Sequence, residues 1–174
     1  MSKQLDILEK LNIADSFTLA MDDEIRREGL PGSLCGFVLE LNKTPDIETL
    51  QLRINDFGQQ FPLAFASLQQ RGKHFYWCKR ETSPSLFHQH YCPENQTNNQ
   101  FQQQIITQLI NDKQDRESIS AIEFHLIISK TAATFFTRWI HPFCDARGID
   151  LILQYLCTKE PEQRKKFGLP KTKP

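Results

Sequence analysis

The clearest feature of the chain is a switch in hydrophobic spacing within residues 134–156. Residues 135–141 alternate between two sets, one containing Phe135 and Trp139 and the other Phe136 and Ile140. That period of two, with aromatic and β-branched residues, predicts a strand. After it, Ile149, Ile152, Leu153 and Leu156 recur at helical spacing. The pattern therefore predicts a strand that ends at His141, a tight turn that carries Asp145, and then a helix.

The same reasoning predicts most other elements. Residues 1–29 suggest two short amphipathic helices. Thr44-Pro45 is typical of a helix start, with apolar residues at helical spacing from Ile47 until Phe61-Pro62 ends the helix. Another helix is expected to begin at Asn98 or Asn99, although its amide-rich start is also typical of a low-complexity segment. Strands are expected at 34–41, within 74–79, at 86–92 and at 119–129. The aromatic residues of 74–79 favour core packing.

A short link joins the strand at 119–129 to the strand that ends at His141, which predicts an antiparallel hairpin. Ile122, Phe124 and Leu126 are expected to point inward, and Glu123 and His125 outward. The order of elements predicts an α+β fold, a two-layer sandwich with an antiparallel or mixed sheet. One domain is expected over residues 1–159, followed by a charged linker or tail over 160–174 that contains three prolines.

Composition removes several classes of function. The 174 residues carry 21 basic and 21 acidic side chains, so no charge excess favours nucleic acid or an anionic membrane surface. The longest apolar runs are too short to span a bilayer, and the polar start MSKQLDILEK has no signal-peptide pattern. The five cysteines are odd in number and form no CxxC, which favours reduced thiols and a cytoplasmic location.

A neutral imidazole near pH 7 can accept a proton from an attacking group, so a catalytic role is one interpretation of His141. A structural or surface histidine is the alternative at such a position. Asp145 would hold the turn through an ion pair or backbone N–H groups, and Gly148 would permit the turn or a close helix approach. Arg147 would be a surface or Asp145-paired residue, with a phosphate contact as the alternative.

Two other groups carry candidate chemistry. Cys144 lies three residues from His141, so a Cys–His nucleophile pair competes with a small buried apolar cysteine. His88, His90 and Cys92 alternate on one predicted strand and would share one face. They lack the usual spacing of zinc ligands and an obvious fourth ligand, so we expect no metal site.

The segment His141-x-x-x-Asp145, followed by a glycine between a strand and a helix, resembles the signature of chloramphenicol-acetyltransferase-like acyltransferases, which include condensation domains. Their common form is His-His-x-x-x-Asp-Gly; here Ile140 replaces the first histidine, and the glycine comes three residues after Asp145. The resemblance implies that His141 is the general base and Asp145 a structural residue. It also implies that an early arginine, Arg26 or Arg27, braces Asp145; solvated surface arginines are the alternative.

The resemblance further implies an activity. The donor would be an acyl thioester on coenzyme A or on a phosphopantetheine arm, the acceptor would be a hydroxyl or an amine, and no cofactor would be bound. Only the N-terminal lobe of the family is matched, so a second lobe or a homodimer is expected to complete the site. The alternative is a non-catalytic interaction domain derived from that lobe.

Overall fold

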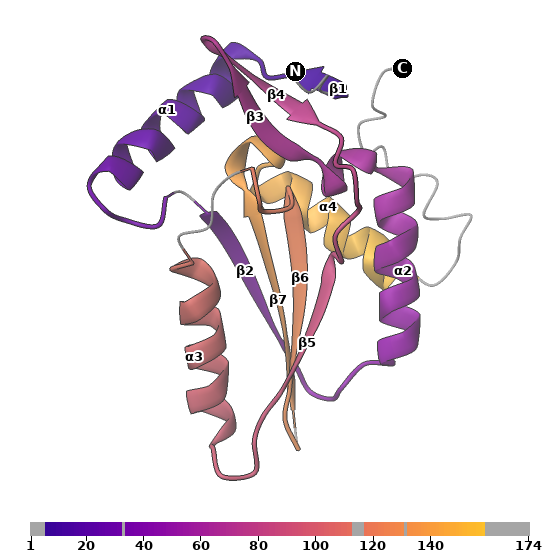
Figure 1. Ribbon diagram of the computed structural model, residues 1–174. Helices are drawn as coiled ribbons and strands as arrows, with labels where there is room; N and C mark the ends of the chain where they lie inside the picture. Colours follow the sequence, from indigo (N-terminus) through magenta and orange to yellow (C-terminus); the bar gives the residue numbers. More distant parts are fainter. Residues whose placement is uncertain (1–5, 33, 113–116, 131, 159–174) are drawn as a thin grey trace.

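A four-stranded mixed sheet forms the centre of the protein (Figure 1). The computed structural model describes residues 6–32, 34–112, 117–130 and 132–158. Strand order is β2-β7-β6-β5, formed by β2 (Leu34–Leu41), β7 (Ala133–Ile140), β6 (Ile122–Ile128) and β5 (Phe87–Tyr91). β7 is antiparallel to both β2 and β6, whereas β5 and β6 are parallel. The predicted hairpin and the mixed α+β class are confirmed, and β7 is a central strand.

Two helices cover one face of this sheet and form the main core with it. α2 (Ile47–Gln60) and α4 (Ala146–Cys157) place Ile54, Phe57, Ile152 and Tyr155 against Phe124. The ring of Phe57 meets those of Phe124 and Tyr155 at 5.9 Å between centroids. Burial of several large aromatic and aliphatic side chains stabilises the fold by about 1.5–3 kcal/mol for each side chain. β7 and α4 therefore have fixed positions on either side of the His141 turn.

The opposite face of the sheet is covered in part by α3 (Asn98–Ile110), which packs against β2 and β7 (Figure 1). His125 does not face solvent as expected. It points away from the main core, as the alternation requires, but it is 2% exposed because the rings of His88, His90 and Phe136 lie against it. Ile122, Phe124 and Leu126 are fully buried on the core side, as predicted.

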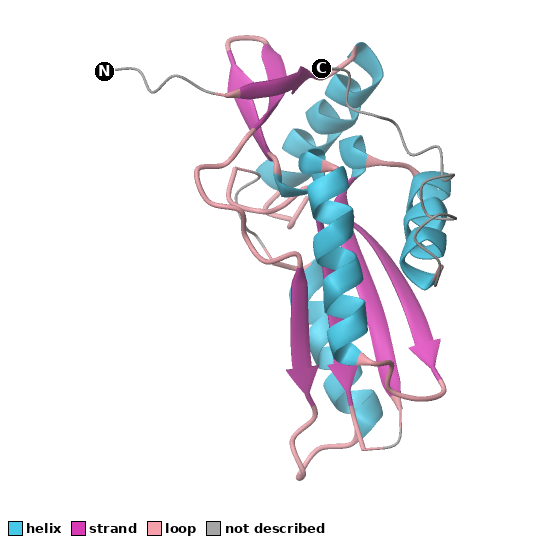
Figure 2. Cartoon of the chain, turned by 90° about the vertical axis from the view of Figure 1, so that its right-hand side faces the viewer, coloured by secondary structure: helices cyan, strands magenta, loops and turns pink. Residues whose placement is uncertain are grey.

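A smaller sheet of order β1-β4-β3 lies beyond one end of the large sheet (Figure 2). Its strands are β1 (Ile7–Lys10), β3 (Ser67–Arg71) and β4 (His74–Cys78). A second apolar cluster joins this sheet to α1 (Ile13–Arg27) and to the end of β7, through Trp77, Leu19 and Ile140. The end of β7 is thereby packed between two cores.

Some expected elements differ in the structure. The first predicted helix is wrong where the structure describes it, because residues 7–10 pair with β4 as a strand. β3 was not expected, and a 3₁₀ turn (η1, Pro62–Phe65) precedes it. α2 is capped by Asp46, whose side chain accepts from the N–H of Thr49 at 3.0 Å, two residues after the predicted Thr44 cap. The predicted tail at 160–174 lies outside the described residues. No helix in the described part is long and apolar enough to cross a membrane.

Candidate functional site

β7 delivers His141 to the position that the sequence pattern indicates. Ile140 is the last residue of the strand, and its N–H donates to the carbonyl of Ala121 at 3.0 Å. His141 then begins a short 3₁₀ turn, η2 (His141–Phe143), in which Pro142 follows it. The His141 side chain is exposed although the strand before it is buried throughout. An imidazole at this point has a fixed backbone and access to solvent.

Two contacts hold the turn that follows His141. The indole N–H of Trp139 donates to the carbonyl of Cys144 at 2.8 Å, which ties the turn back to β7. The ring of Phe143 meets Trp77 edge to face, with 6.5 Å between centroids. Such edge-to-face pairs add about 0.5–1.5 kcal/mol beyond the burial of area. Trp139 of the large sheet and Trp77 of the small sheet therefore anchor the turn that follows His141.

Asp145 is the N-cap of α4. Its Oδ1 accepts from the N–H of Gly148 at 2.7 Å, so the carboxylate satisfies one of the free N–H groups at the helix start. Gly148 has no positive φ, but a Cβ added there would lie 2.7 Å from the Cβ of Cys144. The glycine thus permits α4 to approach the turn closely, and Asp145 and Gly148 act together in starting the helix.

The arginines that the sequence analysis proposed lie in different surroundings. Arg147 is exposed in the first turn of α4. Arg26 forms an ion pair with Asp22 on its own helix, with 2.8 Å between Nε and Oδ2, and a Cβ added at Gly32 would meet both side chains. Arg27 pairs with Glu24 on the solvent side of α1. The brace between Arg26 and Asp145 remains a prediction, and the Asp22 pair shows that Arg26 supports the turn before β2.

The thiol of Cys144 is unsuited to act as a nucleophile. Burial, with smaller contributions from the nearby Asp145 and Cys35, raises its pKa to about 12. Because the thiolate is the reactive form, Cys144 stays protonated and unreactive near neutral pH. This geometry favours the other interpretation, a half-buried apolar cysteine in the turn.

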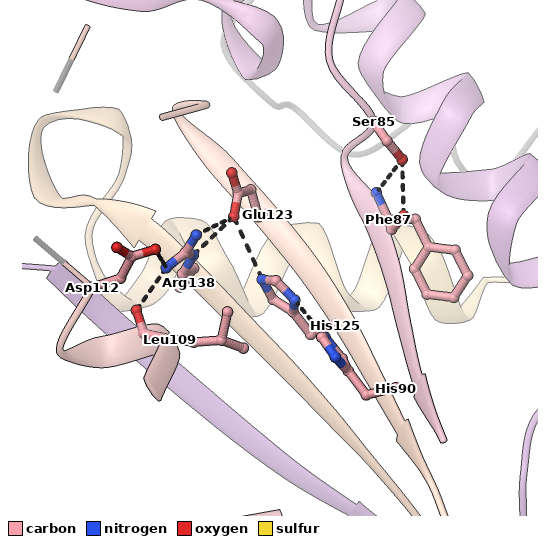
Figure 3. Close-up of polar contacts among 8 residues, drawn as sticks. All are labelled: Ser85, Phe87, His90, Leu109, Asp112, Glu123, His125 and Arg138. Atoms are coloured by element: carbon pink, nitrogen blue, oxygen red, sulfur yellow. Dashed lines mark hydrogen bonds and ion pairs between the residues drawn. The ribbon is translucent and has the colours of Figure 1, made fainter. Parts of the chain in front are cut away.

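A second polar cluster, which sequence analysis did not assemble, lies on the α3 side of the sheet (Figure 3). Arg138 of β7 and Glu123 of β6 are direct cross-strand partners. Oε2 of Glu123 accepts from Nε and Nη2 of Arg138 at 2.8 and 2.7 Å. Arg138 also donates to the carbonyl of Leu109 at 2.6 Å, and Asp112 lies 3.8 Å from it. The Glu123–Arg138 pair therefore links the sheet to the end of α3.

Three histidines extend this cluster towards the edge strand β5. Nδ1 of His125 lies 3.1 Å from Nε2 of His90, and the ring of His88 stacks on His125 with 4.9 Å between centroids. Nε2 of His125 is 3.5 Å from Glu123, too far for a good hydrogen bond. Because Glu123 only accepts, the consistent arrangement has Nε2–H of His125 facing Glu123 and His90 donating to Nδ1.

The electrostatics of this cluster favour a neutral His125 and an ionised Glu123. Burial lowers the pKa of His125 to about 4, against the opposing effect of Glu123. The pKa of Glu123 is lowered to about 2, because contacts with His125 and Arg138 outweigh the effect of burial. Among the described residues no group of three His, Cys, Asp or Glu side chains could hold a metal ion.

No protein-family model and no curated protein matches this sequence. Its fold is shared with solved condensation domains. A starter condensation domain of rhizomide synthetase RzmA in complex with C8-CoA has a TM-score of 0.72 at 8% identity, over 88% of this chain and 35% of that one.

Two further solved structures are similar to this chain. The first condensation domain of the calcium-dependent antibiotic synthetase, in complex with a substrate analogue, has a TM-score of 0.71 at 11% identity, over 90% of this chain and 38% of that one. The tallysomycin biosynthesis protein TlmII has a TM-score of 0.69 at 12% identity, over 85% of this chain and 34% of that one. This chain thus has the fold of one lobe and spans little more than a third of those chains.

Proposed function

We propose that this chain supplies the histidine-bearing lobe of a condensation-type acyltransferase. The observation that carries the proposal is the placement of His141, exposed immediately after the buried strand β7, with Asp145 capping the helix that follows. The reaction would transfer an acyl group from a thioester of coenzyme A or of a phosphopantetheine arm to a hydroxyl or an amine. The condensation domain that binds C8-CoA in its solved structure supports this class of donor.

His141 would act as a general base. The acceptor O–H or N–H gives its proton to a ring nitrogen of His141 as the acceptor atom attacks the thioester carbonyl carbon. When the tetrahedral intermediate collapses, the C–S bond breaks and the thiolate leaves with the proton from the imidazolium. An ester or amide and a free thiol are formed, and His141 returns to its neutral form. Asp145 takes no proton in this scheme and keeps the turn and α4 in place.

The proposal is tested by thiol release from octanoyl-CoA in the presence of a panel of hydroxyl and amine acceptors. Loss of a general base lowers such a rate by about 10²- to 10⁴-fold, and this is the decrease expected for His141→Ala. His74→Ala is the matched control, because His74 is an exposed histidine at the start of β4. Acceptor-dependent thiol release that is equal in His141→Ala and the unmodified protein would remove the general-base role.

A partner is expected to complete the site. β2 is an edge strand in the described part of the sheet, and Phe37 and Val38, on opposite faces of it, are 40% and 42% exposed. A long edge strand with exposed apolar side chains is a surface for pairing with another chain or segment. We propose that a second lobe or a second copy of the chain covers this edge. Sedimentation of the unmodified protein and of Val38→Lys would test a second copy, since a lysine on the edge opposes pairing.

A non-catalytic interaction domain is the second candidate function. It is favoured by one observation: this chain spans about a third of the solved condensation domains, so a groove between two lobes needs more than this chain. Binding of octanoyl-CoA that is retained in His141→Ala, without acceptor-dependent thiol release in either protein, would favour this candidate.

A further inference from the structure

α1 presents an acidic residue to the His141 turn. Asp15, Leu19 and Asp22 follow each other at helical spacing, and Leu19 and Asp22 are buried on the side of α1 that faces the rest of the protein. Asp15 shares that side and is half-buried. The same helix packs against η2, the 3₁₀ turn that begins with His141. The first turn of α1 therefore carries a half-buried carboxylate on the inward side of a helix that packs against the turn of the candidate base.

The Asp15 carboxylate is fixed by the helix cap. The N–H of Asp15 donates to Oδ1 of Asn12 at 2.9 Å, and Nδ2 of Asn12 donates to Oδ2 of Asp15 at 2.7 Å. This reciprocal pair holds the side chain in one orientation and favours its ionised form. Oδ1 of Asp15 is not part of this hydrogen bond, so one carboxylate oxygen is left for another donor.

Asp15 and His141 interact electrostatically across this contact. Burial raises the pKa of Asp15, whereas the Asn12 hydrogen bond and, to a smaller extent, the electrostatic effect of His141 lower it. A half-buried carboxylate is costly unless a donor or a positive charge faces it. An imidazolium at His141 would supply that charge, and it is the species that forms when His141 takes a proton from an acceptor.

We infer that Asp15 is a positioning residue for His141, which orients the imidazole and stabilises the imidazolium formed during acyl transfer. The inference rests on the proposed function of His141 as a general base. Asp15 keeps its negative charge throughout: the proton passes from the acceptor to His141 and then to the leaving thiolate. An ionised partner also determines which ring nitrogen carries the proton in the resting state.

The experiment is ¹⁵N NMR of the His141 ring at about pH 8, where an ordinary imidazole is neutral. We expect one tautomer to predominate in the unmodified protein. Asp15→Asn preserves the shape of the cap but removes the charge and offers an N–H₂ group, so the tautomer ratio should change. Asp15→Glu preserves the charge and should restore the original ratio in part. Glu24→Ala removes a charge from the exposed side of the same helix and should leave the ring signals unchanged.

Acyl transfer provides the second readout. Asp15→Asn should lower the rate of thiol release from octanoyl-CoA by about 3- to 30-fold, the range for a half-buried charge interaction. Asp15→Glu should recover part of this loss. A purely structural role would give the opposite order, because asparagine at this position preserves the cap.

The outcomes are separable. An unchanged tautomer ratio in a folded Asp15→Asn protein overturns the inference, whatever its activity. An altered ratio in Asp15→Asn that Asp15→Glu restores supports it. Equal acceptor-dependent thiol release in His141→Ala and the unmodified protein would overturn the proposed function, and the ring signals would still decide whether Asp15 positions His141.

Discussion

Glu123 and Arg138 are direct neighbours on β6 and β7, and both are largely removed from solvent. Arg138 is 6% exposed, and its guanidinium also donates to the last turn of α3 through the carbonyl of Leu109. The ion pair therefore does more than satisfy two charges: it attaches a helix without any charged side chain to the sheet that carries His141.

Replacement of Arg138 by methionine is expected to destabilise the protein by about 3–5 kcal/mol, because Glu123 is left buried without its cation. The double variant Glu123→Leu/Arg138→Met should regain most of this loss, since two apolar side chains carry no desolvation cost. The free energy of unfolding in urea measures both effects. Lys130→Met, which removes an exposed pair with Glu94, should change it by less than about 1 kcal/mol. A double variant that is no more stable than Arg138→Met would contradict the coupling.

The stability of the protein should fall in mild acid because of His125. Its pKa is about 4 in the folded protein and 6.5 ordinarily, so the unfolded chain binds a proton first as pH falls. Stability is therefore unaffected above about pH 6.5, decreases between pH 6.5 and 4, and is lower by about 3 kcal/mol below that window.

Urea unfolding between pH 7.5 and 4.5 measures this loss, and His125→Phe should reduce the slope. His74→Phe is the control, because His74 is exposed. Equal slopes in the His125 variant and the unmodified protein would show that another group causes the acid sensitivity. Glu123, with a pKa of about 2, loses its contribution only in stronger acid, as pH falls from its ordinary value of 4.5 through 2.

Gly148→Ala is expected to destabilise the protein by about 1–3 kcal/mol, although alanine favours helices, because the added Cβ meets Cys144 at 2.7 Å. Thermal melting measures the change. Arg147→Ala is the matched control next to it; its side chain is exposed, so stability should stay within about 0.5 kcal/mol. A stabilised Gly148→Ala protein would mean that α4 can move away from the turn without cost.

Asp145→Ala and Asp145→Asn separate two roles of the motif aspartate. Loss of the cap in Asp145→Ala should cost about 1 kcal/mol, whereas asparagine caps nearly as well and should cost little. Thermal melting and thiol release from octanoyl-CoA are measured on both variants. Equal damage from the two changes would instead indicate a charge interaction of Asp145, such as the arginine brace that the family resemblance implies.

Local pattern was sufficient for the elements whose apolar residues follow one period and whose ends carry their own signals. The strand at 34–41 begins and ends where its apolar run predicts. The strand–turn–helix around His141 was also predicted, because the hydrophobic period changes from two to the helical spacing within a few residues. Residues 7–10 were mistaken for a helix because four residues carry too little pattern, and β4 decides their conformation.

The sequence by itself determined that a strand ends at His141 and that a turn with Asp145 precedes the next helix, since both depend on neighbours along the chain. Only the tertiary structure decided that His125 is buried, that Glu123 meets Arg138, and that α1, which carries Asp15, packs against the His141 turn. Alternation along a strand predicts which residues share a face of the sheet. The packing of other elements decides whether that face meets solvent, a charged group or another chain segment.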